Sequence, residues 1–469
     1  MPANRLAPSE TRRRVVVIGG GNAALCAAMA AHDAGASVTV LERAEKPFRG
    51  GNTRHTRNIR TVHSGADGYV TGPYLYDEFL ADLASVTGSD ADPALAAQTI
   101  AESETITAWM MEHGANWQAP LKGTLGLART NHFFLGGGKS LLNAYYIRAQ
   151  DAGIEIHYEA MVTGLDLDGR HCRGVRVRFG TDSEEEYVQA DAFVVASGGF
   201  EANRDWLAEY WGPAAYNFIV RGTANNDGSV LRELLDAGAR RVGDPGAAHA
   251  IAVDARAPKY DAGIITRLDA VPIGIAVNCE AKRFYDEGED MWPKRYATWG
   301  RLIASQPEQL AFAIFDNKVA NETIPGLYPP YRAETIEELA TQLGLDPVAV
   351  GRTVDEFNAS CQVGRFDLSE LDDCRTEGLV PPKSHWARPI DTAPYYGYPL
   401  RTGITFTYMG VAVDPEARVQ CDGDGAFENV FAAGEIMSGN VLTRGYLAGF
   451  GMTIGSVWGR IAGGSAARA

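Results

Sequence analysis

The hydrophobic pattern is densest near the N-terminal end of the chain. Residues 15–18 (VVVI) are continuously apolar, which is typical of a strand buried on both faces, because a half-exposed strand alternates apolar and polar residues. A glycine-rich turn follows at once, and the pattern then predicts a helix from Asn22 to about His32 and a second apolar strand over 36–41. Strand, turn, helix and strand in this order predict a nucleotide-binding unit of an α/β fold.

Buried strands, glycine-rich turns and helices are predicted in the same manner up to about residue 245. Apolar spacing near 3.6 residues predicts helices, a run of apolar residues ending in a glycine pair predicts another buried strand, and glycine-rich turns open or close further helices. The expected helices are 76–86, 93–113, 141–152 and one that ends at Gly238; the expected strands are 154–158 and 192–200.

From about residue 245 to 390 the strands become shorter and the loops more polar, with a helical pair over 335–343 and 347–361. Residues 398–461 again have the pattern of the N-terminal part. It predicts strands near 411–413 and 429–433 and an apolar helix with several glycines over 449–461. We therefore predict a Rossmann-like nucleotide-binding domain of the glutathione-reductase type, formed by 1–245 and 391–469. An α+β capping domain over 246–390 interrupts it.

Composition narrows the class of protein. The chain has 469 residues, 45% of them hydrophobic, and a formal net charge of −16, which argues against a nucleic-acid partner because phosphate binding draws on clustered Lys and Arg. No run of about 20 apolar residues indicates a membrane span. The six cysteines lie far apart without a C-x-x-C pair, so no metal cluster is expected. We expect a cytoplasmic protein with a short disordered leader before the first strand.

The turn after the first strand carries a dinucleotide fingerprint. Gly19, Gly21 and Ala24 fit G-x-G-x-x-G/A: the first glycine permits the tight turn, the second lets the backbone approach a pyrophosphate, and the alanine lets helix and strand pack closely. Glu42 ends the second strand about 20 residues later, where a carboxylate accepts hydrogen bonds from ribose hydroxyls. This context predicts a dinucleotide site.

Hydrogen-bond donors crowd the segment after Glu42. Gly50 and Gly51 supply a second flexible turn, and in so acidic a protein the cations that follow indicate that an anion is handled nearby; the donors are Asn52, Thr53, Arg54, His55, Arg57, Arg60 and His63. The strand 192–200 is expected to place Ser197, Gly198 and Gly199 against the same cofactor, and Asp227 stands in a further loop before a helix.

These segments resemble the flavoprotein subunits of fumarate reductases and succinate dehydrogenases over nearly the whole chain. The resemblance rests on VVVIGGGNAAL, Glu42, GGNTRHTRN, ASGGF, GITFTYMGVAVD and VFAAGEIMSGN, and the AAGE segment implies FAD and not NAD. Within the family, four segments most resemble FAD-dependent tricarballylate dehydrogenases: RGGNTRHTRNIR, KSHWARPIDTAPYYGYP, RTGITFTYMGV and AGEIMSGNVLTRGYLAGFGMTIGSVWGRIAG. That implies oxidation of propane-1,2,3-tricarboxylate to cis-aconitate, with a separate membrane-linked iron–sulfur protein that reoxidises the flavin.

The resemblance also implies roles for single residues around FAD. Gly19, Gly21, Asn22 and Ala23 would hold the pyrophosphate; Glu42 and Arg43 the adenosine ribose; Gly51, Asn52 and Thr53 the pyrophosphate and ribityl side; Gly198 and Gly199 the adenine side; Glu435 the ribityl hydroxyls; and Gly451, Met452 and Thr453 the flavin O2 edge. Gly50, Ser197 and Asp227 are further candidates for binding the cofactor. The histidine that carries covalent flavin in succinate dehydrogenases has no clear match, so FAD is expected to be non-covalent.

The substrate residues depart from the fumarate reductase pattern. The histidine that precedes a Met-Gly-Gly turn is absent from TFTYMG (405–410), and Arg444 falls one or two positions from the family's late arginine. Removing a proton next to a carboxylate requires that the carboxylate be neutralised, so several cations should meet there. The candidates for substrate binding are His55, Arg57, Arg60, His63, Arg401, Tyr408 and Arg444.

For proton transfer the resemblance points to a cap-domain arginine that follows the segment RFYDE (283–287). Arg295 is the first candidate, and Tyr296 and Arg301 are the alternatives. An arginine is a poor base because its pKa lies above 12, whereas that of tyrosine is near 10.

Other functions stay open at this stage. A 3-ketosteroid desaturase would use tyrosines beside the flavin, and a fumarate-reductase-like enzyme would reduce another unsaturated acid. The ring-contraction flavoproteins of cobalamin synthesis would need an additional iron–sulfur portion. A simple FAD-holding electron carrier has no need of a substrate cap. A small-molecule carboxylate is the expected ligand, with an iron–sulfur or quinone-linked acceptor protein as partner.

Overall fold

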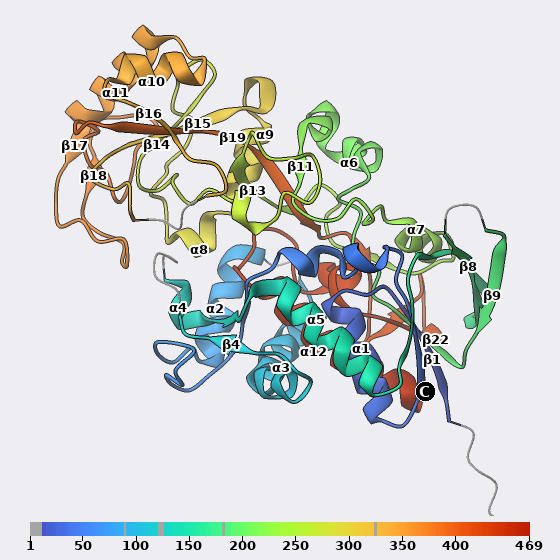
Figure 1. Ribbon diagram of the computed structural model, residues 1–469. Helices are drawn as coiled ribbons and strands as arrows, with labels where there is room; N and C mark the ends of the chain where they lie inside the picture. The colour runs from blue at the N-terminus through green and yellow to red at the C-terminus, as the bar shows by residue number, and fades with distance from the viewer. Residues whose placement is uncertain (1–11, 89–90, 121–125, 181–182, 323–325) are drawn as a thin grey trace, which may run out of the picture.

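The computed structural model describes residues 12–88, 91–120, 126–180, 183–322 and 326–469; the expected leader lies mostly outside this part of the chain. Figure 1 shows two lobes, with strands β1 and β22 in one and helices α10 and α11 in the other. No helix in the described ranges is long and apolar enough to cross a membrane. The mixed α/β fold predicted from the sequence is confirmed.

The main sheet has the strand order β21-β22-β10-β1-β2-β6. Parallel pairing joins β1 to both neighbours, with Val16 opposite Phe193 on one side and Thr39 on the other. Apolar residues that fill both faces of these strands explain why the continuous apolar runs fold as central strands. The strands are β1 (Arg14–Ile18), β2 (Ser37–Leu41), β6 (Glu155–His157), β10 (Ala192–Val195), β21 (Arg418–Gln420) and β22 (Ala426–Ala432).

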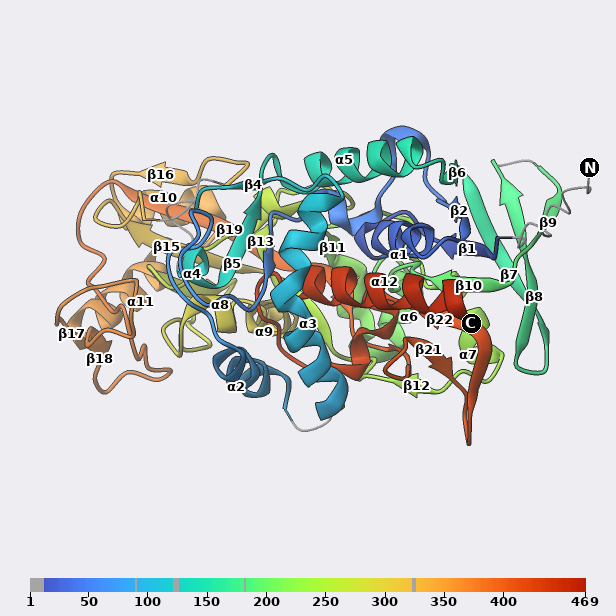
Figure 2. The same cartoon turned by 90° about the horizontal axis from the view of Figure 1, so that it is seen from below.

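Two helices pack together against this sheet, α1 (Asn22–Asp33) and α12 (Phe450–Arg468), and Figure 2 shows them side by side. Glycines make the approach close: a Cβ on Gly459 would lie 2.5 Å from the Ala23 carbonyl oxygen, and one on Gly463 would lie 2.0 Å from that of Ala27. The close seam sets the start of α1 against the second turn of α12, where Gly455 faces Asn22 and Ala23.

The cap is built on a second sheet of order β11-β19-β15-β14, with β13 and β16 also paired to β19. Its longest strand, β19 (Tyr395–Thr407), and the short β11 (Ile219–Val220) both lie outside the predicted 246–390 range. The cap sheet therefore begins before and ends after the predicted boundaries. Its remaining elements are β13 (Ala248–Asp254), β14 (Ile275–Asn278), β15 (Ala311–Asp316), β16 (Tyr331–Ala333), α8 (Trp292–Arg295), α9 (Thr298–Ala304), α10 (Ile336–Leu343) and α11 (Pro347–Ser360).

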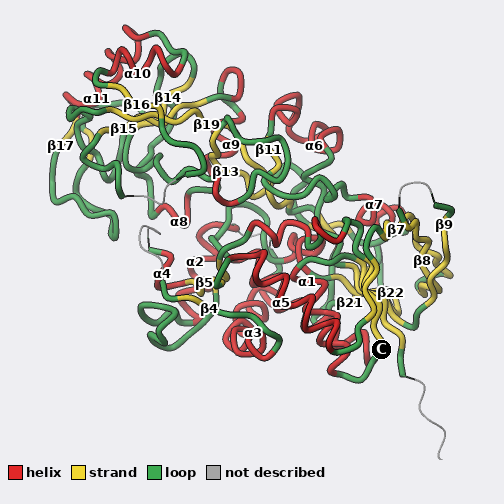
Figure 3. Tube along the Cα trace, in the orientation of Figure 1, coloured by secondary structure: helices red, strands yellow, loops and turns green. Residues whose placement is uncertain are grey.

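Smaller elements complete the described chain, and Figure 3 shows how loops connect them. The other helices are α2 (Tyr76–Thr87), α3 (Pro93–Glu112), α4 (Leu127–Thr130), α5 (Gly137–Asp151), α6 (Arg204–Trp211) and α7 (Ser229–Asp236), and the 3-10 turns used below are η2 (Gly51–His55), η4 (Ile264–Thr266) and η6 (Gly434–Asn440). The minor strands are β3 (Asn58–Arg60), β4 (Trp117–Gln118), β5 (Asn131–Phe134), β7 (Ala160–Asp168), β8 (His171–Phe179), β9 (Glu185–Gln189), β12 (Arg241–Val242), β17 (Cys361–Gln362), β18 (Arg375–Thr376) and β20 (Gly410–Val411).

Candidate active site

A long pocket runs from the fingerprint turn to the cap. It has about 1560 Å³ of unfilled space, open solvent at its mouth included. Its lining comes from the carboxyl ends of the main-sheet strands, from η2, and from the cap residues around β13 and β19. Ligands of open α/β sheets bind at this edge, so the main-sheet end of the pocket is the expected cofactor end.

The fingerprint turn is shaped by close backbone contacts. Gly19 has φ +114°, and a Cβ there would lie 2.3 Å from the Ala196 carbonyl oxygen. The backbone N–H of Asn22 donates to Thr53 Oγ1 at 3.0 Å, and its side-chain Nδ2 donates to Ser456 Oγ at 2.9 Å. These bonds fix the start of α1, whose amino end attracts negative charge.

The adenosine end of the pocket is organised by Glu42 and Arg43. The buried Glu42 carboxylate accepts the backbone N–H groups of Ala44, at 2.8 Å, and Gly50, at 2.9 Å. Burial raises the pKa of Glu42. Arg43 Nη1 lies 2.7 Å from Asp227 Oδ2, and both residues line the pocket, so this ion pair borders the cavity near Glu42.

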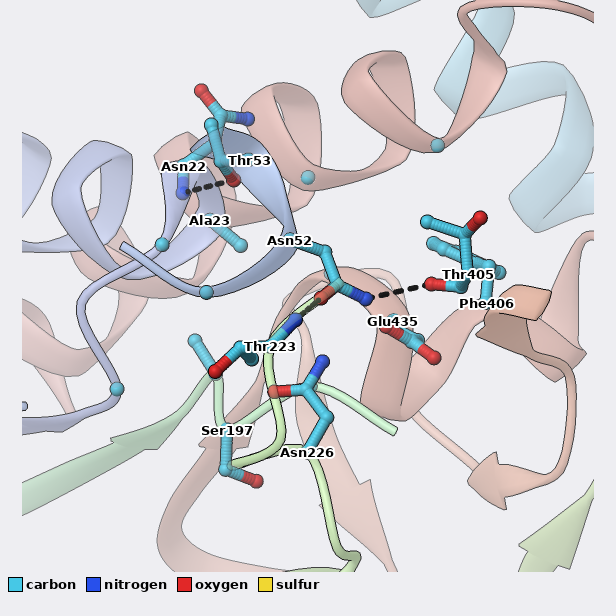
Figure 4. A pocket seen from close by; sticks show the side chains of 18 of the residues that line it. Asn22, Ala23, Asn52, Thr53, Ser197, Thr223, Asn226, Thr405, Phe406 and Glu435 are labelled. Atoms are coloured by element: carbon cyan, nitrogen blue, oxygen red, sulfur yellow. Dashed lines mark hydrogen bonds between the residues drawn. The ribbon is translucent and has the colours of Figure 1, made fainter. Parts of the chain in front are cut away.

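Asn52 connects the two domains in the middle of the pocket (Figure 4). Its Nδ2 donates to the Thr405 carbonyl oxygen at 2.7 Å and to the Glu201 carboxylate, and its Oδ1 accepts the Thr223 N–H at 2.9 Å. Nearby, Glu435 accepts hydrogen bonds from the N–H of Thr407 at 2.8 Å and from its hydroxyl at 3.1 Å. Burial raises the pKa of both Glu201 and Glu435, which favours their protonated forms.

Most of the predicted cofactor residues line this pocket: Gly19, Gly21, Asn22, Ala23, Glu42, Arg43, Gly51, Asn52, Thr53, Ser197, Gly198, Asp227, Glu435, Gly451 and Met452. Three do not reach the lining but support it. Gly50 donates its N–H to Glu42, Gly199 lies so close to Glu435 that a Cβ would meet Oε1 at 2.1 Å, and the Thr453 hydroxyl donates to the Arg60 carbonyl.

The residues present fit an FAD. The cavity is elongated, the amino end of α1 faces it beside the strained Gly19 turn, and Glu42 stands beside Ala160 and Val162 at one end.

Three guanidinium groups gather at the opposite end of the pocket, those of Arg57, Arg221 and Arg267. Arg267 pairs with the buried Asp269 at 2.6 Å. Nε and Nη2 of Arg57 and Nε of Arg221 are buried without a hydrogen-bond partner in the described part of the chain. Burial, reinforced by the positive charge of Arg267, lowers the pKa of Arg57 and of Arg221 to about 10, so both stay cationic at neutral pH.

Three aromatic side chains stand beside these cations. The hydroxyl of Tyr296 lies 2.9 Å from His249 Nε2, and the imidazole of His249 stacks on the ring of Tyr446, with centroids 3.8 Å apart and planes at 16°. The Tyr446 hydroxyl accepts the Gly451 N–H at 2.7 Å. The guanidinium of Arg267 lies over the Tyr296 ring, 4.3 Å from its centroid. All of these side chains line the pocket.

Of the candidates for substrate binding, His55 and Arg57 line the pocket, and the others are engaged elsewhere. Arg60 donates to Tyr74 at 2.8 Å, and His63 bonds to the carbonyls of Gly72 and Arg129. The Tyr408 hydroxyl donates to the Gly445 carbonyl. Arg401 Nη1 donates to the Glu308 carbonyl oxygen at 3.4 Å, and Arg444 is exposed beside Gly88.

The three proton-transfer candidates are also separated. Tyr296 lines the pocket and is buried. Arg295 lies outside the lining, 3.8 Å from Glu289 and 3.6 Å from Asp290, and Arg301 lies over the ring of Trp211, 4.5 Å from its centroid. Successive residues point in different directions after α8, so only one of the pair Arg295 and Tyr296 faces the cavity. The role of Arg295 in proton transfer stays a prediction that its position does not favour.

The sequence analysis did not identify four residues at the cationic end of the pocket: Arg221, His249, Arg267 and Tyr446. None stands in a recognisable motif. A signal was present only for Tyr446, which lies two positions from the predicted Arg444 in a segment that approaches the pocket.

Comparison with known proteins places this geometry in a family. The model of the FAD binding domain family matches residues 14–451. The chain belongs to this family. A probable fumarate reductase of Shewanella frigidimarina, Ifc3, is 26% identical over 481 residues, which span 98% of this chain and 76% of the relative.

Solved structures of the family share the fold. The open conformation of a flavocytochrome c3 fumarate reductase matches with a TM-score of 0.75 and 23% identity, over 98% of this chain and 79% of that one. A 3-ketosteroid-Δ4-(5α)-dehydrogenase from Rhodococcus jostii RHA1 matches with a TM-score of 0.71 and 23% identity, over 99% of both chains. The predicted FAD cofactor is confirmed, and the chain is an FAD-dependent oxidoreductase acting on CH–CH groups.

Proposed function

We propose that this enzyme interconverts the single and double bond of a carboxylate-flanked C–C unit, with tricarballylate and cis-aconitate as the substrate pair. The observation that carries the proposal is the pair of cationic side chains Arg57 and Arg221. Nε and Nη2 of Arg57 and Nε of Arg221 are buried without a protein partner in the described chain, whereas Nη1 of Arg221 donates to Thr405 Oγ1 at 2.8 Å. Buried charges are ordinarily paired, so an anionic ligand is the natural counter-charge. A substrate with several carboxylates supplies it.

The residues divide the chemistry between them. Bound FAD supplies the hydride-transfer chemistry. Arg57 and Arg221 hold a substrate carboxylate and stabilise the negative charge that develops beside it when the α-proton moves. Tyr296 lies within the same pocket and exchanges that proton. Arg267 is paired with Asp269, so it orients and polarises the site more than it binds a free charge.

Tricarballylate is preferred to a simpler acid for two reasons. The sequence motifs resemble those of tricarballylate dehydrogenases, and the site lacks the histidine of the fumarate reductase pattern, with Thr405 and Phe406 in the corresponding segment of the lining. A separate iron–sulfur or quinone-linked protein is the proposed electron acceptor, as the resemblance implies.

A 3-ketosteroid is the second candidate, because two tyrosines, Tyr296 and Tyr446, line the same end of the pocket and a steroid dehydrogenase shares the fold. An uncharged steroid would leave the Arg57 and Arg221 nitrogens unpaired, which costs free energy. The unpaired cations therefore favour the polycarboxylate.

Dye-linked turnover tests the proposal in both directions. The FAD-loaded enzyme is expected to reduce a dye acceptor with tricarballylate and to form cis-aconitate, and to oxidise a reduced viologen with cis-aconitate. Androst-4-ene-3,17-dione serves as the competing substrate. Turnover of the steroid without turnover of any carboxylate would overturn the proposal.

A further inference from the structure

We propose that His249 is the proton partner of Tyr296, so that the two side chains move the substrate proton as one unit. The inference rests on the proposed function, since it concerns the proton that leaves or joins the carbon next to a carboxylate. It assigns a role to a histidine that neither the motifs nor the family resemblance singled out.

The geometry joins the two groups directly. His249 lies on β13 and Tyr296 follows α8, and their Nε2 and hydroxyl oxygen are 2.9 Å apart, an ordinary hydrogen-bond distance. Both residues are buried, His249 at 7% and Tyr296 at 3% exposure, and both line the pocket. The stack of His249 on Tyr446 holds the imidazole in place from the nucleotide-binding domain.

The groups that face this pair from the neighbouring elements are mostly cationic. Arg221 follows β11, Arg57 precedes β3 and Arg267 follows η4, whereas Asp269 is the facing carboxylate and Tyr446 is neutral. Burial, followed by repulsion from Arg221 and Arg267, lowers the pKa of His249 well below its usual value. The imidazole is therefore neutral at physiological pH, and its Nε2 can accept the hydrogen bond of the Tyr296 hydroxyl.

Tyrosine alone is a weak proton acceptor at this site. Burial raises the pKa of Tyr296, so its hydroxyl is protonated at neutral pH. In the oxidative direction the α-proton of the substrate passes to the Tyr296 oxygen while the Tyr296 hydroxyl proton passes to His249 Nε2. The hydride that leaves the adjacent carbon would go to bound FAD, which supplies the oxidant. The reductive direction returns both protons along the same bonds.

Substrate charge assists the transfer. The imidazolium that forms on His249 is disfavoured first by burial and then by repulsion from Arg221 and Arg267, and substrate carboxylates at Arg57 and Arg221 offset the repulsion. A carboxylate substrate therefore makes its own proton acceptor stronger, whereas a neutral ligand does not.

Anaerobic stopped-flow reduction of the FAD-loaded enzyme by tricarballylate tests the kinetic side. We expect Tyr296→Phe to slow flavin reduction about 100-fold or more and His249→Gln to slow it at least tenfold. Malonate, a dicarboxylate, serves as the binding probe. Neither substitution should change its dissociation constant by more than about twofold, because Arg57 and Arg221 bind it. The matched controls are Tyr187→Phe and His157→Gln, which lie on the outer strands β9 and β6 and should react at the wild-type rate.

Two readouts separate proton transfer from support of the fold. In D₂O the wild-type rate should fall, because the Tyr296 hydroxyl proton exchanges with solvent and moves to His249, whereas the carbon-bound α-proton does not exchange; His249→Gln should show little solvent isotope effect. If wild-type enzyme reacts with tricarballylate and His249→Gln keeps both its rate and its solvent isotope effect, the inference fails while the proposed function stands.

A substrate-free measurement keeps the inference testable by itself. In ¹⁵N-histidine NMR of the holoenzyme, one ring should stay neutral between pH 6 and 8, with Nδ1 protonated and Nε2 accepting a hydrogen bond. Its signal should shift in Tyr296→Phe and vanish in His249→Gln. A ring protonated at Nε2 overturns the inference, even if tricarballylate reduces the flavin. If that ring has the expected state and tricarballylate is inert, the proposed function fails instead.

Discussion

The side-chain amide of Asn52 donates a hydrogen bond to the carbonyl oxygen of Thr405, 2.7 Å away. Asn52 belongs to the η2 turn of the nucleotide-binding domain, and Thr405 lies near the end of β19 in the cap sheet. The bond therefore joins the two domains where the cofactor end of the pocket meets the substrate end.

Replacing Asn52 with alanine should weaken FAD binding. The change removes the donor to Thr405 and Glu201 and the acceptor of the Thr223 N–H, all partly or fully buried. Stranded polar groups cost about 1–3 kcal/mol, so the dissociation constant should rise roughly tenfold. Fluorescence titration of the apoprotein with FAD measures it. Asn143→Ala, on the exposed face of α5, is the control, and equal affinities for the two variants would contradict the role of Asn52.

Replacing Arg221 with glutamine should weaken substrate binding and not FAD binding. A lost charge-assisted hydrogen bond costs about 1.5–3 kcal/mol, so the KM for tricarballylate should rise about 10- to 100-fold. The free enzyme should be no less stable, because the change relieves the repulsion between buried cations. Steady-state kinetics and thermal melting measure the two effects. Arg375→Gln, on β18, should leave both unchanged, and an unaltered KM for Arg221→Gln would refute the anion site.

Alanine at Gly19 should abolish FAD binding. The residue has φ +114°, and its Cβ would lie 2.3 Å from a backbone oxygen that cannot easily move. Gly35 is the matched control, since its φ is +94° but its Cβ would meet nothing within 4 Å. Gly35→Ala should cost only about 1 kcal/mol of unfolding free energy and retain the flavin. Flavin content after purification and urea unfolding distinguish the two, and normal flavin content in Gly19→Ala would show that the turn is not needed.

The stability of the cap should rise with pH above 8 because of Lys383. Its ammonium is buried between the carbonyls of Pro272 and Gly274, and burial lowers its pKa to about 8, against about 10.4 in the unfolded chain. At pH values between these two pKa values the unfolded chain binds more protons than the native state, so the free energy of unfolding increases with pH.

Urea unfolding across pH 7.5 to 10.5 measures this effect as the difference between wild type and Lys383→Met. The difference should change in favour of wild type by up to about 3 kcal/mol. Lys282→Met, at an exposed lysine, serves as the control and should give a flat difference. If the difference for Lys383→Met does not change with pH, the pKa of the Lys383 ammonium is not lowered in the native state.

The sequence alone predicted the parts of the fold that depend on local pattern. The unit from Val15 to Glu42 combines strand, turn and helix within one short segment, and the structure has it with boundaries shifted by at most one residue. The last helix starts near Gly449 as predicted but extends beyond the predicted end to Arg468, and Gly455, Gly459 and Gly463 along it pack closely on α1.

The substrate end could not be predicted in the same way, because it depends on strand pairing between distant segments. Val220 and Ala250 both pair with Ile404 of β19, one on each side, and this register brings their chain neighbours Arg221 and His249 together. Nothing in the local pattern gives that register. Arg295 and Tyr296 are adjacent in sequence, yet only Tyr296 lines the pocket, since side-chain direction is set by how α8 packs.

The most direct test of the central claim is the anaerobic reaction of the yellow holoenzyme with three compounds in turn: tricarballylate, succinate and androst-4-ene-3,17-dione. Absorbance near the oxidised flavin maximum reports reduction. The arginine-lined site predicts bleaching by tricarballylate, with stoichiometric cis-aconitate, and slower bleaching in Arg221→Gln at low substrate concentration. Bleaching by the steroid, with neither acid reacting, would contradict the account.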